Sequence, residues 1–252
     1  MKSIAILLDG GYVRHQLYLL LGNRHATADD IIDLSRAICV KDEDLFRIYY
    51  YDCPPHEGRA TNPLLKSPVD FGNTPTARRS KSLHDGLAQR DHVAFRKGEL
   101  RFRGWGFNTQ LSQVFMRSSS LSLSSDRKTF EVRINLDLEA LQRMRLVDVA
   151  RLPKDDAEAA ALIVNHIIKP ELEQKRVDIK IGLDVAWLAS RRIVDRIALV
   201  TADTDFIPAM KFARREGVQV VLVPLGRKPS PDMCEHADEV RSVIVKSGAR
   251  KR

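Results

Sequence analysis

The chain has 252 residues, of which 44% are hydrophobic, so it is long enough and apolar enough to bury a substantial core. No apolar run approaches the roughly 18 to 20 residues that a membrane span requires, which excludes a transmembrane helix. The first apolar stretch is short and ends at Asp9, which argues against a signal peptide. We therefore expect a cytoplasmic protein without membrane contact, and the formal charge of +8 favours nucleic acids among its partners.

Strands and helices alternate at the start of the chain. Residues Ile4–Leu8 form a short continuous apolar run, which is typical of a strand buried on both faces of a parallel sheet, and the run ends at Asp9. A helix is predicted over residues 29–39, where apolar residues recur with helical spacing behind an acidic start. A strand is predicted over residues 46–51 and also ends at an aspartate, Asp52.

Residues 54–128 interrupt this alternation, and we interpret them as a basic insertion within a single domain that spans residues 1–252. The sequence "HVAFRKGELRFRGWGF" predicts two short strands around Lys97 and Gly98, in the manner of a small hairpin, and a serine-rich loop is expected over residues 117–128. The hairpin could pack its aromatic side chains inward, or it could use them with its arginines to hold bases and phosphates. These arginines are Arg96, Arg101 and Arg103.

The alternating pattern returns from about residue 130. Residues 130–146 predict a strand followed by a helix, and a further helix is predicted over residues 155–168, before Pro170. The last part of the chain predicts a helix and then a parallel strand–helix–strand crossover. These elements are expected over residues 179–191, 197–201, 207–215 and 218–223.

Acidic residues stand where two of the predicted strands end. Asp9 follows the first strand, and Asp203 and Asp205 follow the strand over residues 197–201. Each aspartate alone is commonly a turn residue or a helix N-cap, but the carboxyl ends of neighbouring parallel strands meet at one edge of the sheet, where ligands bind. Carboxylates that converge there repel each other unless a cation lies between them, and ligand sets made only of oxygen atoms select Mg²⁺ or Mn²⁺. The sequence therefore predicts a metal site at this edge.

Asp178 and Asp184 are the next acidic candidates. Both border the buried stripe of the helix predicted over residues 179–191, but they lie about 9 Å apart along its axis, so one ion is not expected to bind both. We favour Asp178 as a ligand, because helix starts face the carboxyl edge of such sheets, and an N-cap role is its ordinary alternative. Asp184 lies within the helix, where an ion pair with Lys180 is the alternative to a metal role.

Four segments of the chain match one known family in their order and sequence. They are "IAILLDGGYVR" (residues 4–14), "YYYDCPP" (49–55), "KRVDIKIGLDVAWLA" (175–189) and "DRIALVTADTDFIPAMKFARREGVQVVLVPLG" (195–226). Through these segments the chain resembles the NYN domain, in its LabA-like branch, within the PIN-like nuclease superfamily. The resemblance implies a Rossmann-like three-layer α/β/α fold with a mainly parallel sheet, and a ribonuclease with a Mg²⁺ or Mn²⁺ site.

Matching the motifs residue by residue assigns the catalytic and metal-binding roles of the family to four carboxylates. The resemblance places these at Asp9, Asp178, Asp203 and Asp205, and it puts Asp184 at the second acidic position of the middle motif. Two residues depart from the family pattern: Arg176 stands where a glycine is usual, and Gly11 stands where some relatives carry an asparagine that could contact phosphate.

We therefore hypothesise that the protein hydrolyses the phosphodiester bonds of single-stranded RNA with a metal-activated water. Arg14, Thr201 and Thr204, together with the three arginines of the insertion, are the candidates for contact with the substrate. The alternative is an RNA-binding or regulatory protein without turnover, whereas a phosphatase of the haloacid dehalogenase type would need an aspartate where Gly11 stands. The sequence leaves open the RNA target, the mode of cleavage, the number of metal ions and whether the chain forms a homo-oligomer.

Overall fold

The computed structural model describes residues 1–63, 65–107, 119–123, 130–134, 154–155, 158 and 168–245. The chain divides into two compact units. The first contains Met1–Glu57, Phe71–Arg101 and Gln174–Arg252, and the second contains Gly58–Asp70 and Phe102–Glu173. The helix predicted after the strand at residue 130 lies outside the described residues, and so does the helix predicted over residues 155–168, apart from residues 155, 158 and 168, of which Ile168 lies in a strand.

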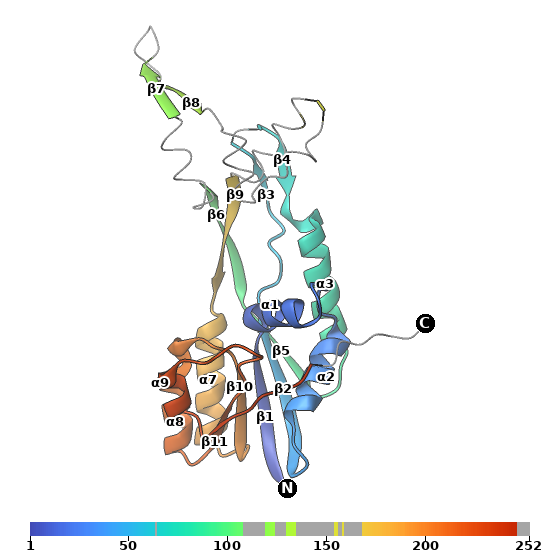
Figure 1. Cartoon of the computed structure of the whole chain (residues 1–252). Coiled ribbons are helices and arrows are strands. Elements are labelled where there is room, and N and C mark those ends of the chain that lie inside the picture. The colour runs from blue at the N-terminus through green and yellow to red at the C-terminus, as the bar shows by residue number, and fades with distance from the viewer. Residues whose placement is uncertain are drawn as a thin grey trace. The chain divides into compact units, whose positions relative to one another are not determined.

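The first unit is built on a six-stranded sheet in which every neighbouring pair of strands is parallel (Figure 1). The strand order is β12–β11–β10–β1–β2–β5, so the first strand of the chain lies inside the sheet. Helices cover both faces, and the predicted three-layer α/β/α, Rossmann-like fold is confirmed. The strands are β1 (Lys2–Asp9), β2 (Glu43–Asp52), β5 (Val93–Lys97), β10 (Arg196–Val200), β11 (Gln219–Leu222) and β12 (Glu239–Val240).

The central strand β1 supplies side chains to both hydrophobic cores. Its residues from Ile4 to Leu8 are all fully buried, because successive side chains of a strand point to opposite faces of the sheet. Ala5 and Leu7 pack on the face that carries α7 (Val177–Ser190), α8 (Ile207–Arg215) and α9 (Pro231–Glu235). Ile4, Ile6 and Leu8 pack on the other face, with α1 (Gly10–Leu20), α2 (Ala28–Ile38) and α3 (Pro75–Ala88). The apolar run at the start of the sequence therefore holds the two cores together.

Local signals explain where the helices begin. Thr27 caps α2 through its hydroxyl, which accepts a hydrogen bond from the Asp30 N–H, while the Asp30 carboxylate accepts one from the Thr27 N–H. Asp9 caps α1, which starts directly after β1 and which the sequence analysis did not identify. Every helix among the described residues is too short or too polar to cross a lipid bilayer.

The two strands predicted around Lys97 and Gly98 are present, but they do not pair with each other. β5 joins the central sheet beside β2, with Phe95 opposite Tyr50, and β6 (Glu99–Phe107) pairs with β9 (Ile168–Lys175). A Cβ atom at Gly98 would lie 2.7 Å from Cys53 Sγ, so the chain passes through a packed region here and does not turn at the surface. The hairpin prediction is therefore corrected: α3 and β5, which fall within residues 54–128, are parts of the central fold.

Two further antiparallel pairs of strands lie in the second unit. β3 (Arg59–Thr61) pairs with β4 (Pro68–Asp70), which a single 3₁₀ turn at Phe71–Asn73 follows. β7 (Ser119–Leu123) pairs with β8 (Phe130–Ile134). The stretch over residues 117–128, predicted as a serine-rich loop, thus contains a strand, because nothing in a run of alternating Ser and Leu prevents an extended backbone.

Gly10 is the position where the backbone of α1 comes closest to β2. A Cβ atom at Gly10 would lie 2.5 Å from the Tyr51 carbonyl oxygen, which is backbone and cannot rotate away. We expect Gly10→Ala to lower the free energy of unfolding by about 1–3 kcal/mol, measured by urea denaturation. Gly182→Ala is the matched control, since that glycine lies within α7 with nothing inside 4 Å of its Cβ position, and it should stabilise the helix by about 0.5–1 kcal/mol. Equal effects of the two substitutions would refute this packing argument.

Candidate functional site

The candidate site lies at the carboxyl edge of the sheet, the upper end of the sheet in Figure 1, where β1 and β10 end side by side. Leu8 is paired with Val200, so Asp9 and Thr201 are the next residues of the two strands. The chain leaves β1 through α1 and α2 toward β2 on one side, while β10 borders β1 on the other side. In open parallel sheets such a change of direction forms the crevice where ligands bind.

Asp9 is held by the helix that follows it. Its Oδ1 atom accepts a hydrogen bond of 3.3 Å from the N–H of Tyr12, in the first turn of α1. Burial raises the pKa of the Asp9 carboxyl, and the negative charges of Asp178 and Asp203 raise it further, against the lowering effect of the backbone N–H groups. Asp9 is therefore a partly buried carboxylate whose ionisation its acidic neighbours oppose.

Asp178 meets the same acidic neighbours from another element. It lies in the first turn of α7, and its pKa is raised by burial and then by the charges of Asp203 and Asp205. Asp203 in turn fixes the loop after β10: its Oδ1 accepts from the Asp205 N–H at 2.9 Å, and its own N–H donates to Thr201 Oγ1 at 3.2 Å. The carboxylates that the sequence predicted from separate elements therefore act on one another electrostatically.

The donor set of this cluster suits a hard divalent cation, because it offers carboxylate oxygens and a cation would relieve their repulsion. Within the described part of the chain, no three acidic, histidine or cysteine side chains already stand at the spacing of a formed metal site. Asp178, Asp203 and Asp205 are exposed, so their side chains can rotate toward an ion, while Asp9 is fixed by α1. The residues fit a site that an ion would complete.

Asp184 and Arg96 are committed to each other and not to the carboxylate cluster. Arg96 donates from Nε to Asp184 Oδ2 at 3.0 Å, and the Tyr51 hydroxyl donates to the same oxygen at 2.8 Å. The arginine also lies over the ring of Tyr49, 5.3 Å from its centre. Six residues along a helix turn Asp184 well away from Asp178 and toward β2 and β5. The structure thus places Asp184 and Arg96 apart from the carboxylate cluster, and their metal and substrate roles stay predictions.

The remaining predicted substrate contacts divide by their exposure. Thr201 is fully buried and supports the Asp203 loop, so its hydroxyl has a structural part and does not face a ligand. Thr204 is exposed. Arg101 pairs with Glu99, and Arg103 pairs with Glu173, and these exposed ion pairs are weak enough to yield to a phosphate.

The sequence analysis missed a buried polar group beside Asp9. Asp52 is the last residue of β2 and its side chain is fully buried, in contact with Arg14 of α1 and His84 of α3. Its place at the end of an apolar strand, like that of Asp9, was the signal that could have marked it. His84 gave no signal, because α3 itself was not predicted.

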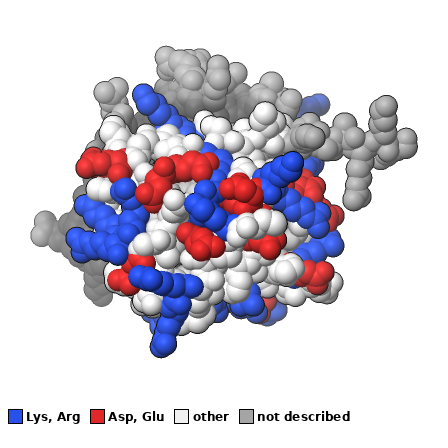
Figure 2. All heavy atoms as spheres, turned by 90° about the horizontal axis from the view of Figure 1, so that it is seen from below, with Lys and Arg blue, Asp and Glu red and all other residues white. Residues whose placement is uncertain are grey.

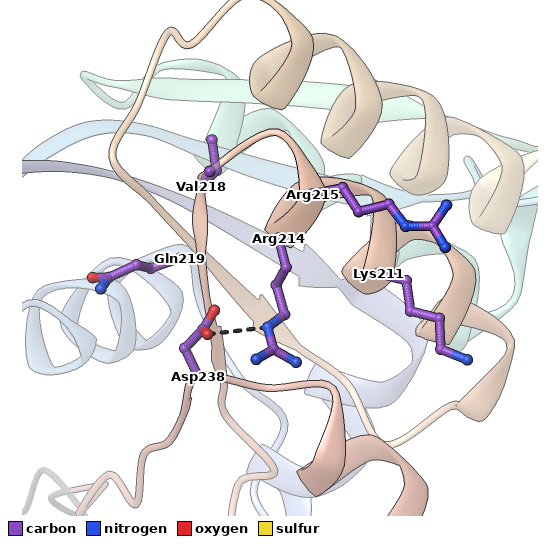
Figure 3. Close-up of a pocket in the computed structure, with 7 residues that line it drawn as sticks. Lys211, Arg214, Arg215, Val218, Gln219 and Asp238 are labelled. Atoms are coloured by element: carbon purple, nitrogen blue, oxygen red, sulfur yellow. Dashed lines mark hydrogen bonds and ion pairs between the residues drawn. The ribbon is translucent and has the colours of Figure 1, made fainter.

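A shallow pocket of about 430 Å³ lies at the opposite, amino edge of the sheet, beside the start of β11 (Figure 3). Arg214 crosses it to form an ion pair of 3.0 Å with Asp238. Basic side chains in the last turn of α8 are expected there without any ligand, since they stabilise the negative end of the helix dipole. Figure 2 views this edge of the molecule, where basic and acidic side chains are interspersed. The pocket is therefore separate from the carboxylates.

Comparison with known proteins finds a match to one family model over part of the chain. The family model described as "NYN domain" matches residues 139–244, which include Asp178, Asp203 and Asp205, while Asp9 lies before the matched range. NYN domains belong to the PIN-like nuclease superfamily.

Two individual proteins are similar to the chain. An uncharacterized protein of Methanocaldococcus jannaschii is 27% identical over 100 residues, which cover 38% of this chain and 42% of that protein, so the chain spans less than half of the length of this relative. A crystal structure of a protein of unknown function from Vibrio parahaemolyticus superposes with a TM-score of 0.44 and 13% identity, over 96% of this chain and 92% of that one.

Proposed function

We propose that the protein is a Mg²⁺- or Mn²⁺-dependent ribonuclease of the LabA-like branch of NYN proteins, and that it hydrolyses phosphodiester bonds of single-stranded RNA in the cytoplasm. The observation that carries the proposal is the carboxylate cluster at the crevice between β1 and β10, where Asp9 and Asp178 have pKa values raised by burial and by their acidic neighbours. The match to the NYN family model supports it, because members of the PIN-like superfamily are generally nucleases. The free cysteines agree with a reducing compartment.

The chain's own residues divide the work of such a reaction. A divalent ion held by Asp9, Asp178, Asp203 and Asp205 would lower the pKa of a bound water and neutralise charge that develops on the phosphate. Asp9 keeps a fixed position because α1 begins on it, and Thr201 and Asp203 hold the loop that presents Asp205. Thr204 and Arg14 are the groups that can hydrogen-bond the phosphate oxygens.

The alternative is an RNA-binding or regulatory NYN protein without turnover. It is favoured by the absence, within the described residues, of three side chains already at metal-site spacing. It is opposed by the cluster itself, since a protein that only binds phosphates gains nothing from negative charges in its crevice. The two functions differ in whether a divalent ion produces shorter RNA.

Asp205→Asn separates these functions. The wild-type protein is incubated with single-stranded RNA and DNA oligonucleotides in Mn²⁺, Mg²⁺ or a chelator, and the products are sized on a denaturing gel. We expect RNA cleavage that requires the ion and that Asp205→Asn reduces at least about 100-fold, because one charge that stabilises the transition state is lost. Asp195→Asn is the matched control: Asp195 precedes β10, at the opposite edge of the sheet, and contacts Ser3. Cleavage that persists in the chelator, or that Asp205→Asn leaves unchanged, would overturn the proposal.

A further inference from the structure

Asp52 is a fully buried carboxylate that collects donors from three elements. Its Oδ1 accepts from Arg14 Nη2 at 3.0 Å and from the Cys53 N–H at 2.8 Å, and its Oδ2 lies 2.9 Å from His84 Nε2. A carboxylate has no proton to give, so the imidazole is the donor in the last contact. Only 7% of the His84 side chain is exposed, and its ring packs against Phe95 at 4.5 Å between centres. Asp52 is therefore held rigidly from β2 and α3.

Arg14 is the one of these groups that reaches the surface. Its Nε donates to the Gly10 carbonyl oxygen at 3.2 Å and its Nη2 donates to Asp52, which fixes the plane of the guanidinium. One third of the side chain, 33%, remains exposed, and Nη1 has no partner among the residues that the structure describes. An arginine whose orientation is fixed by hydrogen bonds on its buried side, and whose other side is exposed to solvent, is pre-organised to bind an anion such as phosphate.

Arg14 lies on α1, the helix that Asp9 caps, and the first residue of this helix packs against the end of β2, since a Cβ atom at Gly10 would lie 2.9 Å from Asp52 Cβ and 3.0 Å from the Tyr50 ring. Tyr50 is buried, and its pKa is raised by burial and by the charges of Asp52 and Asp9, while Arg14 lowers it. The hydroxyl of Tyr50 has no hydrogen-bond partner among the described residues. Asp9, Asp52 and Arg14 are therefore grouped around the carboxyl ends of the neighbouring strands β1 and β2.

We infer that Arg14 binds a backbone phosphate of the RNA next to the bond that is cut, and that Asp52 and His84 are positioning residues that orient Arg14 for it. This inference rests on the proposed function for its ligand. A buried ion pair adds little to stability compared with apolar packing, whereas it fixes the geometry of the exposed partner. The bond from His84 to the far oxygen of Asp52 prevents the carboxylate from rotating away from Arg14.

A double-mutant cycle tests the positioning. Binding of a fluorescent single-stranded RNA is measured by anisotropy in chelator, over a range of salt concentrations, for wild type, Arg14→Gln, Asp52→Asn and the double variant. We expect Arg14→Gln to weaken binding about tenfold and to reduce the slope of log K against log salt by about 0.7, the value for one phosphate contact on a single strand. Asp52→Asn keeps the arginine charge, so we expect it to leave this slope in place.

Asp52→Asn changes both the charge near the RNA and the orientation of Arg14, and these two effects are separated by making the substitution with and without Arg14. Loss of the Asp52 charge by itself favours RNA, and this effect is measured in the Arg14→Gln protein, where no arginine remains to be oriented. The change in RNA affinity caused by Asp52→Asn is measured once in the wild-type protein and once in the Arg14→Gln protein. We expect the affinity change in the wild-type protein to be less favourable to binding by a factor of at least about three. Equal effects of Asp52→Asn with and without Arg14 would show that Asp52 is merely structural. The inference would also be overturned if Arg14→Gln left the affinity and the salt slope unchanged, or if the wild-type protein did not bind RNA. If Asp52→Asn does not fold, His84→Gln takes its place in the cycle.

Cleavage in Mn²⁺ is measured on the same proteins and distinguishes this inference from the proposed function. RNA cleavage by wild type together with an additive cycle would remove the role of Asp52 and leave the nuclease. A coupled cycle with no cleavage would keep Arg14 and Asp52 as an RNA-binding pair and remove the nuclease.

Discussion

Asp9→Asn is expected to reduce metal-dependent RNA cleavage at least about 100-fold and, in the same protein without metal, to raise the melting temperature by roughly 2–4 °C. Asparagine caps a helix as well as aspartate does, so α1 keeps its capping hydrogen bond from the Tyr12 N–H. What the substitution removes is a partly buried negative charge that Asp178 and Asp203 repel, and for a chain of this size that temperature shift corresponds to about 1 kcal/mol. Differential scanning fluorimetry in chelator and in Mn²⁺ measures the melting temperatures, and sizing of the RNA products on a denaturing gel measures the cleavage.

The pH dependence of the stabilisation by Asp9→Asn follows from the raised pKa of the Asp9 carboxyl. A carboxyl that is harder to ionise in the folded state destabilises the fold at pH values above its raised pKa, and this destabilisation is relieved as the pH falls through that value. The stabilisation by Asp9→Asn should therefore be largest near neutral pH and shrink on acidification. Asp195→Asn should act in the opposite direction, because hydrogen bonds from Ser3 lower the pKa of Asp195. An Asp9→Asn protein that melts below wild type in chelator, or that Mn²⁺ stabilises as much as wild type, would contradict the metal site.

Glu43→Gln is expected to lower the free energy of unfolding by about 3 kcal/mol, which urea denaturation measures. The Glu43 side chain is fully buried at the amino end of β2 and accepts from Arg196 at 2.5 Å and from Arg241 at 2.8 and 3.0 Å. Removing its charge leaves two arginines, with 15% and 7% of their side chains exposed, without their shared counter-charge. Because Arg241 directly follows β12, the network ties the last strand of the sheet to β2.

Glu239→Gln is the control for this network, because Glu239 binds the same Arg241 with 44% of its side chain exposed, and we expect it to cost less than about 1 kcal/mol. Burial alone would raise the pKa of Glu43, but the hydrogen bonds from Arg241 and Arg196 outweigh it and lower the pKa. The stability that Glu43 contributes is therefore present above the usual glutamate value of about 4.5 and is lost as the pH falls through its lower folded value. The Glu43→Gln protein should lose stability less steeply than the wild-type protein in that acidic range. Equal losses of unfolding free energy for the two glutamate substitutions would refute this account.

The sequence predicted the elements in which one short pattern decides the structure. The short apolar runs at β1 and β10 are typical of buried strands, and the aspartates at their ends can meet only if the two strands are neighbours, which they are. It did not predict α1, because Gly10 and Gly11 favour a turn when the contact that requires Gly10 is unknown. It did not predict α3 either, because that helix buries Ser80 and His84 among only a few apolar residues.

The contacts of the site residues that the sequence did not predict depend on long-range packing. Asp184 and Arg96 pair only because β5 joins the sheet beside β2, and no local pattern shows which strand a basic segment will join. Arg176 is a different case, because the sequence already shows an arginine where the family usually has a glycine, whereas only the structure shows the backbone conformation of this residue. It adopts a φ of 70° as the N-cap of α7, in the left-handed region that favours glycine, one residue before the helix that carries Asp178 begins.

The order of the strands also decides when the carboxylates can first meet during synthesis. Ser3 and Asp195, which hold the starts of β1 and β10 together, are 192 residues apart, so most of the chain must leave the ribosome before β10 can add to β1. Pairings this distant in sequence form slowly. A chain that is released or cut before Arg196 carries Asp9 without Asp203 and Asp205, and so lacks two of the four carboxylates proposed to hold the ion. Under the proposed chemistry, an incomplete copy of the chain lacks the complete ion site that RNA cleavage requires.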